Sequence, residues 1–458
     1  MKSLRNTITI LLLAISTGCH AVIRVAEVFT SHMVLQQQKP VTVWGTADSG
    51  EQVRVTFGGQ KAATLADANG QWRVTLKAMK ATAQPQAMTI SGRRNKQKLT
   101  DILIGEVWLA SGQSNMEYSM NAHPNYKKPQ KGDPDRLLHE WETADNKNIR
   151  LLYVERKLNT DTLPTVGWQH VGQESLKPFS AAAWFFAKML QDSLKVPVGI
   201  ISSSWGGTKI EVWTPDRGDR YRHMVQPLAG YQLRGFLWYQ GETNLINGDT
   251  DAYGPKFEQL VSSWRKAWGD DTLPFYYVQI SPYTYSQRKD YIVPHTWQDL
   301  PRFWEVQTRG MDIPYTGMAV TTDLPERLDD MHPPYKWVVG ERLCRWALNR
   351  TYGYNHVLCQ GPVLRRATRQ DDKAILEFDH AEGGLTTADG KAPDWFYTNS
   401  RGGRYYKANA VIDGNRVIVD INPQEKHPVV RFGYDETAQP NLRGAASGLP
   451  AQPFEIKL

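Results

Sequence analysis

The sequence lacks the patterns that mark several large classes of protein. Its 458 residues contain no collagen period, heptad run, low-complexity tract or internal repeat, which excludes fibrous, coiled-coil and repeat architectures. The formal net charge is +7, yet Lys and Arg form no clustered run, so we expect no binding to nucleic acid. One apolar stretch, residues 8–15, stands out near the start. It is too short to span a bilayer.

That apolar stretch belongs to an N-terminal segment with the order of a secretory signal. Lys2 and Arg5 precede it, and small residues follow up to Ala21. Because charge, apolar run and small residues come in this order, we predict that residues 1–21 direct export to the periplasm or the cell exterior. Two kinds of processing stay open. Cleavage after Ala21 releases a free protein, whereas the Gly18-Cys19 pair resembles a lipoprotein signal and would leave a lipid anchor on Cys19.

Cysteine is scarce, with three in the chain, and no Cys-x-x-Cys or His-x-x-x-His spacing is present. We therefore predict no metal site and no cofactor. Apart from Cys19 the cysteines are Cys344 and Cys359, fifteen positions apart. In an exported protein such a pair favours a disulfide, which we predict here; two buried free thiols are the alternative, because the sequence does not show the geometry that a bridge needs.

What the chain does contain is typical of a globular protein, with 41% hydrophobic and 22% charged residues. Short alternating runs separated by Gly- and Asp-rich turns predict a β-sandwich module over residues 22–102. From residue 103 to 356, buried apolar runs alternate with helical patterns, which predicts an α/β domain with a parallel sheet. Strand patterns return over residues 357–458 and predict a C-terminal β module.

Chemistry-bearing residues follow the apolar runs of the central domain. Ser114 lies in a loop after the first run, and Met116 excludes the Gly-x-Ser-x-Gly elbow of α/β-hydrolases. His332 lies in a later loop, close to Asp329 and Asp330. A serine nucleophile needs a base, and a carboxylate can orient that base. Two further loops, 204–208 and 240–244, offer hydrogen-bond donors for an oxyanion.

Taken together, these loops resemble the conserved blocks of the SGNH/GDSL hydrolase superfamily, and within it the sialate O-acetylesterase family. The resemblance spans nearly the whole mature chain. It is carried by segments 34–36, 43–45, 105–108, 111–117, 204–208, 238–244, 332–333, 441–442, 448–450 and 453–454. It implies a flavodoxin-like hydrolase domain with flanking β modules, and removal of O-acetyl esters from sugars.

The resemblance also implies roles for individual residues. It makes Ser114 the nucleophile and His332 the general base, with Asp329 matching the Asp-x-x-His spacing and Asp330 as the alternative orienting residue. The implied oxyanion hole consists of the Ser114 backbone N–H, a backbone N–H of Gly206 or Gly207, and the Asn244 side chain. Residues expected to line or brace the pocket are Gln113, Asn115, Trp205, Gln240 and Glu242.

The resulting prediction is an exported serine esterase that acts on an O-acetylated sugar through an acyl-enzyme. Sialic acid is the substrate that the resemblance names, and acetylated xylan or pectin is the alternative. A third possibility is a glycan-binding protein without catalysis, suggested by the β modules and the sixteen Trp residues. The complete set of Ser, Asn, Asp and His argues against this third interpretation.

Overall fold

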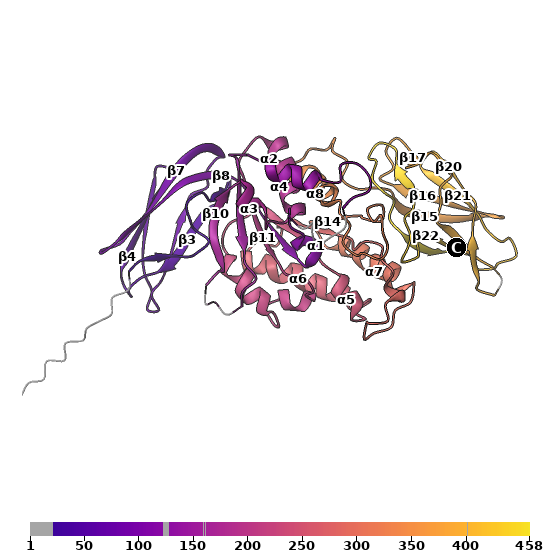
Figure 1. Ribbon diagram of the computed structural model, residues 1–458, viewed down its shortest axis with the longest axis horizontal. Coiled ribbons are helices and arrows are strands. Elements are labelled where there is room, and N and C mark those ends of the chain that lie inside the picture. Colours follow the sequence, from indigo (N-terminus) through magenta and orange to yellow (C-terminus); the bar gives the residue numbers. More distant parts are fainter. Residues whose placement is uncertain (1–21, 122–127, 159, 161, 401) are drawn as a thin grey trace, which may run out of the picture.

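The computed structural model describes residues 22–121, 128–158, 160, 162–400 and 402–458. The predicted signal segment, including Cys19, lies outside the described residues. An N-terminal β module, a central α/β domain and a C-terminal β module follow one another along the long axis of the molecule (Figure 1). No helix within the described ranges is both long and apolar enough to cross a membrane.

The N-terminal module pairs two small groups of strands around one apolar core. One group has the order β1-β3-β6, and the other pairs β4 with β5 and β7, and β7 with β8. Inward and outward residues alternate along β4 and β6, which is the pattern of strands with one solvated face. The strands are β1 (Arg24–Val25), β2 (Val34–Gln36), β3 (Val41–Thr46), β4 (Gln52–Phe57), β5 (Gln60–Leu65), β6 (Gln71–Leu76) and β7 (Thr82–Ser91).

Strand β8 (Lys96–Gly112) joins this module to the central domain, because one continuous strand serves both. Its first half alternates between exposed and partly buried residues, and from Ile102 onward it is fully buried. The predicted domain boundary at residue 102 therefore falls inside a strand. The buried half passes through the middle of the central sheet, so the N-terminal module and the central domain share one strand.

The central sheet has the strand order β10-β9-β11-β8-β12-β13-β14. From β9 to β14 neighbouring strands are parallel, and β10 pairs with β9 in the antiparallel sense. The run β11-β8-β12-β13-β14 is a flavodoxin-like order, to which β9 and β10 are added at one edge. The added and central strands are β9 (Ile149–Val154), β10 (Thr165–His170), β11 (Val198–Ser204), β12 (Gly235–Tyr239), β13 (Phe275–Val278) and β14 (Thr316–Ala319).

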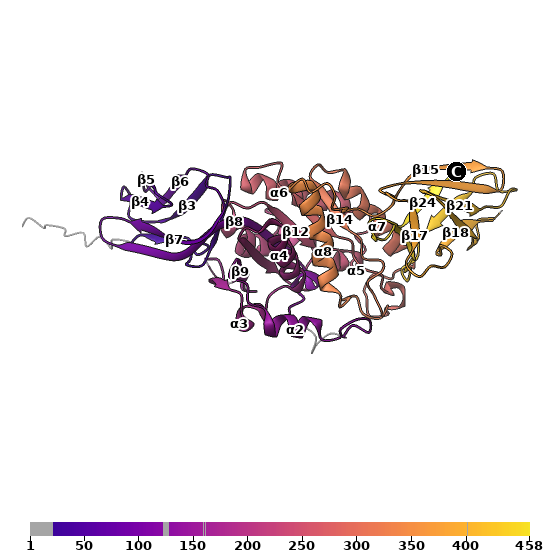
Figure 2. The ribbon, with the colours of Figure 1, turned by 90° about the horizontal axis from the view of Figure 1, so that it is seen from above.

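Helices cover both faces of this sheet, as its fully buried strands require. Helices α4 and α8 pack on one face and α6 and α7 on the other (Figures 1 and 2). Helix α4 begins just after Ser180, whose Oγ accepts the Ala183 N–H at 3.2 Å and so caps the helix. The helices are α1 (Ser114–Glu117), α2 (Arg136–Thr143), α3 (Gln173–Leu176), α4 (Ala181–Leu194), α5 (Glu242–Ile246), α6 (Tyr253–Trp268), α7 (Asp299–Arg309) and α8 (Lys336–Trp346).

The C-terminal module is built from antiparallel strands around its own core. Two four-stranded sheets have the orders β15-β16-β21-β20 and β19-β18-β22-β24, and β17 pairs with β23. The strands are β15 (Val363–Gln370), β16 (Lys373–Asp379), β17 (Leu385–Thr387), β18 (Phe396–Asn399), β19 (Tyr405–Lys407), β20 (Ala410–Asp413), β21 (Arg416–Asp420), β22 (Val429–Phe432), β23 (Leu442–Gly444) and β24 (Phe454–Lys457). The predicted fold class, an α/β domain with flanking β modules, is confirmed.

The predicted disulfide is wrong. Cys344 and Cys359 are both free and buried, and both belong to the apolar core on the α4 and α8 side of the sheet. Burial raises the pKa of each thiol, which keeps both in the protonated form that packs as a small apolar group. The fifteen-residue spacing suggested a disulfide bridge, but the two side chains pack in the apolar core as free thiols.

Candidate active site

Four loops meet at the carboxyl edge of the central sheet. Ser114 follows β8, Gly206 follows β11, the 240–244 segment follows β12, and His332 lies in the loop after β14. Strand β8 lies where the chain order of the sheet reverses, with β11 on one side and β12 on the other. Ligands of open α/β sheets bind at such a switch point, beyond the carboxyl ends of the strands.

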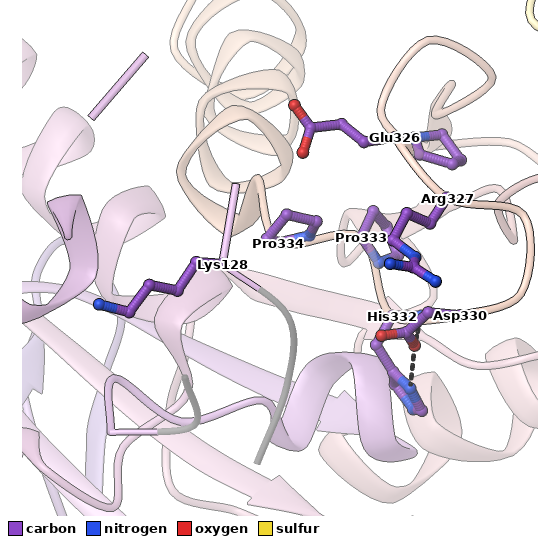
Figure 3. Close-up of a pocket in the computed structure, with 8 residues that line it drawn as sticks. Lys128, Glu326, Arg327, Asp330, His332, Pro333 and Pro334 are labelled. Carbon is purple, nitrogen blue, oxygen red and sulfur yellow. Dashed lines mark hydrogen bonds and ion pairs between the residues drawn. The ribbon is translucent and has the colours of Figure 1, made fainter. Parts of the chain in front are cut away.

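A serine, a histidine and an aspartate are hydrogen-bonded in series at this edge. His332 Nε2 lies 2.9 Å from Ser114 Oγ, and His332 Nδ1 lies 3.1 Å from Asp330 Oδ1. Figure 3 shows the Asp330 carboxylate above the imidazole, joined to it by the dashed contact. This is the arrangement in which an imidazole can take the serine proton while a carboxylate stabilises the resulting imidazolium.

In the structure the carboxylate of Asp330 contacts His332 Nδ1, whereas the sequence predicted this contact for Asp329. Asp330 Oδ1 also accepts the backbone N–H of His332 at 2.9 Å. This turn, which ties an Asp to the backbone two residues on, brings the carboxylate over the ring of that second residue. The Asp329 carboxylate accepts from Arg327 Nε and Nη2 at 3.0 and 2.8 Å, and its side chain is 58% exposed. The prediction of Asp329 rested on the Asp-x-x-His spacing, which does not show which carboxylate a local turn brings to the ring.

Next to the serine, Gly206 presents its backbone N–H to an anionic oxygen. A Cβ on Gly206 would lie 3.3 Å from Ser114 Cβ, so the two residues are in close approach. The Gly206 N–H donates to Glu117 Oε2. Within the described chain, the backbone N–H groups of Ser114 and Gly207 donate to no protein acceptor. The backbone N–H groups of Ser114, Gly206 and Gly207 can therefore act as the donors of an oxyanion hole beside the serine. The Glu117 carboxylate accepts from one of them, the Gly206 N–H.

The Asn244 side chain does not complete this oxyanion hole, contrary to the prediction. It is fully buried, and its Nδ2 donates to Glu211 Oε2 at 3.1 Å and to Asp249 Oδ2 at 3.0 Å. Lys256 Nζ bridges the same two carboxylates, at 2.7 Å from each. Because an amide nitrogen has two hydrogens, the pair of carboxylates takes both of them. Asn244 therefore braces the loop after β12.

The other residues predicted around the pocket divide into buried braces and one partly exposed aromatic. Gln113 and Gln240 are buried and bonded to each other, with Gln240 Nε2 at 3.1 Å from Gln113 Oε1. This bond ties the loop after β8 to the loop after β12. Trp205 is partly buried, and the Arg220 guanidinium lies 4.4 Å from its ring centroid. Such a ring beside the serine offers a flat surface for a sugar.

Comparison with known proteins decides the family. A family model described as carbohydrate esterase, sialic acid-specific acetylesterase, matches residues 104–348, just over half of the chain. The chain belongs to this family. It is 29% identical to sialate O-acetylesterase from Homo sapiens over 78% of this chain and 76% of that protein, and 28% identical to the Mus musculus protein over 78% and 79%. The crystal structure of XAC1771, described as a carbohydrate acetylesterase from Xanthomonas citri, superposes with a TM-score of 0.85 at 31% identity, covering 95% of this chain and 99% of that one.

This relationship makes the protein a carboxylic ester hydrolase of the carbohydrate O-acetylesterase class. The esterase also contains a buried network beneath Ser114 that sequence reasoning only partly anticipated. Asn115 Nδ2 donates to Glu242 Oε1 at 2.5 Å and to the Met331 carbonyl at 3.0 Å, while its Oδ1 accepts from Lys336 Nζ at 2.6 Å. Asn115 therefore links the turn that contains Ser114 to Met331, the residue before His332.

Lys336, which the sequence did not single out, is fully buried at the start of α8. Its ammonium lies 4.7 Å from the Tyr118 ring centroid and 5.3 Å from the Tyr239 ring centroid. Burial lowers the pKa of Lys336 to about 7, and the negative charges of Glu242 and Asp330 oppose this shift. Burial also raises the pKa of the Glu242 carboxyl. No local sequence pattern predicts that a lysine four positions after His332 lies buried next to the site, so only the tertiary structure identifies Lys336.

The lowered pKa of Lys336 predicts a pH dependence of stability. Between pH 7 and the ordinary lysine pKa of about 10.4, the unfolded chain binds a proton at this side chain that the folded protein does not bind. The free energy of unfolding should therefore rise with pH over this window, relative to Lys336→Met, by at most about 1.4 kcal/mol per pH unit. Denaturant unfolding of both proteins from pH 6 to 10 measures this difference. The exposed Lys61 on β5 provides a control, because Lys61→Met should show no such trend.

Proposed function

We propose that this esterase removes O-acetyl groups from sialic acids through an acetyl-enzyme on Ser114. The observation that carries the mechanism is the series of contacts from Ser114 Oγ to His332 and on to Asp330. His332 takes the hydroxyl proton as Ser114 Oγ attacks the acetyl carbonyl carbon. It then gives that proton to the sugar oxygen as the ester bond breaks. Water, activated by the same imidazole, hydrolyses the acetyl-serine and releases acetate.

Oxyanion stabilisation in this mechanism falls to backbone N–H groups rather than to the Asn244 amide. The Ser114 N–H and the Gly206 N–H are the two donors, with Gly207 beside them. The Glu117 carboxylate at the Gly206 N–H leaves when the acetyl group enters, because the carbonyl oxygen needs the same donor. Arg156 Nη1 lies 2.5 Å from Glu117 Oε1, and this ion pair would keep the displaced carboxylate neutralised.

Cationic side chains near the pocket are the groups that would bind an anionic sugar, and in the structure each of them is paired with a carboxylate of the protein. Arg156 and Arg220 lie on the Gly206 side, through their contacts with Glu117 and Trp205. Arg327 lines the pocket beside His332, and the same lining includes Lys128, whose ammonium points away from His332, and the carboxylates of Glu326 and Asp330 (Figure 3). Sialic acids carry a carboxylate, whereas the xylose units of xylan do not. A guanidinium group recognises a carboxylate with two parallel hydrogen bonds.

Acetate release from three substrates tests this assignment. We expect O-acetylated sialic acid to be hydrolysed with a kcat/KM at least ~10-fold above that of its carboxylate methyl ester, since a charge-assisted hydrogen bond contributes about 1.5–3 kcal/mol. Acetylated xylan should be hydrolysed more slowly than either. Equal rates on the acid and its methyl ester would show that the carboxylate is not recognised. A preference for xylan would overturn the sialate assignment in favour of a plant polysaccharide.

We also propose that the esterase is exported, from the order of charge, apolar run and small residues in segment 1–21. Mass spectrometry of the mature protein from the cell envelope distinguishes the two processing routes. A mature chain that starts at Val22 indicates cleavage after Ala21, and a lipid-modified Cys19 indicates an anchor. An intact chain that starts at Met1 would contradict export through this signal.

A further inference from the structure

Two histidines and an aspartate from distant parts of the chain converge where the N-terminal module meets the central sheet. His32 lies in the turn before β2, Asp101 in β8, and His170 at the end of β10. His32 Nδ1 and His170 Nε2 each lie 2.8 Å from Asp101 Oδ2, and the two ring nitrogens lie 3.1 Å apart. Within the described ranges, this is the one cluster of His, Cys, Asp and Glu with the geometry of metal ligands.

Hydrogen bonds alone do not satisfy this triangle of atoms. Each ring nitrogen that faces the centre carries at most one hydrogen, which points to one of the other two atoms. If both nitrogens are protonated, each N–H can donate to Asp101 Oδ2, but the two nitrogens, 3.1 Å apart, are then both donors and form no hydrogen bond with each other. If only one is protonated, its single N–H makes one of the three contacts a hydrogen bond and the other two are not hydrogen bonds. A cation at the centre accepts the lone pairs of all three atoms at once.

The spacings match the ligand sphere of zinc. Zn–N bonds of about 2.0–2.1 Å in a tetrahedron place neighbouring ligand atoms about 3.3 Å apart. The three observed separations, two of 2.8 Å and one of 3.1 Å, are shorter than that value by about 0.5 and 0.2 Å, and a small outward movement of the side chains would make room for the ion. Two imidazoles and one carboxylate suit Zn²⁺, whereas Mg²⁺ and Ca²⁺ prefer oxygen ligands throughout.

The surroundings hold this cluster in place. Arg150 Nη2 lies 3.3 and 3.4 Å from the two Asp101 oxygens, which orients the carboxylate as the outer partners of metal ligands do. His32 and Asp101 have φ angles of +70° and +54°, a conformation that non-glycine residues rarely adopt. His32 and His170 line one surface hollow and are partly exposed, with side-chain exposures of 40% and 49%. An ion from solution can therefore reach them.

We propose that His32, Asp101 and His170 bind one Zn²⁺ ion, with water at the fourth position, and that the ion fastens the N-terminal module to the edge of the catalytic domain. The role is structural because Asp101 lies eleven residues before the end of β8, roughly 35 Å along the strand from the turn of Ser114. The sequence predicted no metal site, since the three ligands come from positions 32, 101 and 170 and form no local motif.

Zinc titration of the full chain, freed of any polyhistidine tag and stripped of metal with a chelator, tests the proposal. In competition with a chromogenic chelator, the wild type should bind one equivalent of Zn²⁺. His170→Ala and His32→Ala should each weaken binding at least ~100-fold, more than the loss of an outer partner would. His139, an exposed histidine paired with Asp133, provides the matched control, and His139→Ala should bind as the wild type does. Acetate release should be the same for the wild type, His170→Ala and His139→Ala.

A second measurement keeps the proposal testable if a variant fails to fold. Co²⁺ added to the stripped wild type should give the intense visible absorption of a four-coordinate site, and one equivalent of Zn²⁺ should remove it. Zn²⁺ should also raise the thermal midpoint of the wild type and leave that of His170→Ala unchanged. A weak six-coordinate Co²⁺ spectrum would overturn the site, and so would wild-type affinity no higher than that of His170→Ala. An equal loss of affinity in His139→Ala would show adventitious surface binding only.

Discussion

Replacing Ser114 with alanine is expected to lower acetate release by at least ~10³-fold while the protein stays folded. The hydroxyl oxygen of Ser114 lies 2.9 Å from His332 Nε2, the atom that would take its proton. Without it no acetyl-enzyme forms, and only binding and the backbone N–H groups remain to accelerate hydrolysis. Rates of acetate release at saturating substrate, with thermal unfolding as the check of folding, measure the effect.

Ser111 provides the control for this substitution. Ser111 lies near the end of β8, three residues before Ser114. Its hydroxyl is buried and has no hydrogen-bond partner among the described residues. Ser111→Ala therefore removes a hydroxyl from the site region without breaking a hydrogen bond, and activity should stay within a few-fold of the wild type. A folded Ser114→Ala protein with one tenth of the wild-type rate would show that another residue is the nucleophile.

The second large effect is expected at Asp330. Its carboxylate accepts from His332 Nδ1 and so selects the tautomer whose Nε2 lone pair faces Ser114. In Asp330→Asn the new amide can donate to Nδ1 and favour the opposite tautomer, in which Nε2 is protonated and cannot act as a base. We expect kcat to fall by up to ~10⁴-fold, as it does when a buried triad carboxylate becomes an amide.

Asp329→Asn is the matched comparison, since it makes the same chemical change one residue earlier. Asp329 pairs with Arg327 at the surface, and exposed ion pairs contribute about 0–1 kcal/mol to stability. Activity of this variant should stay within a few-fold of the wild type. Measurement of kcat for both variants at one pH separates the two carboxylates. A larger loss in Asp329→Asn would overturn the assignment of Asp330, and full activity in both would point to a Ser–His pair without a carboxylate.

The two carboxylates also show how far sequence reasoning reached into the site. Ser114 and His332 each follow a parallel strand of the same sheet. Because the carboxyl ends of such strands lie at one edge of the sheet, the sequence predicts that the two residues meet there. Which aspartate contacts the ring depends on a turn between Asp330 and His332, and spacing alone argued for the wrong residue. Asn244 illustrates the same limit, because its amide is taken by Glu211 and Asp249, which no local pattern connects to it.

By itself, the sequence determined the succession of β, α/β and β modules, the family resemblance and the loops that carry the serine and the histidine. These depend on periodicity and on short motifs, both of which are local properties of the chain. Tertiary structure alone decided that Cys344 and Cys359 stay free, that Lys336 lies buried beneath Ser114, and that His32, Asp101 and His170 converge. The physical reason is that these contacts join residues up to hundreds of positions apart. Their distances are set by how the strands and helices pack and not by the local conformation of any segment.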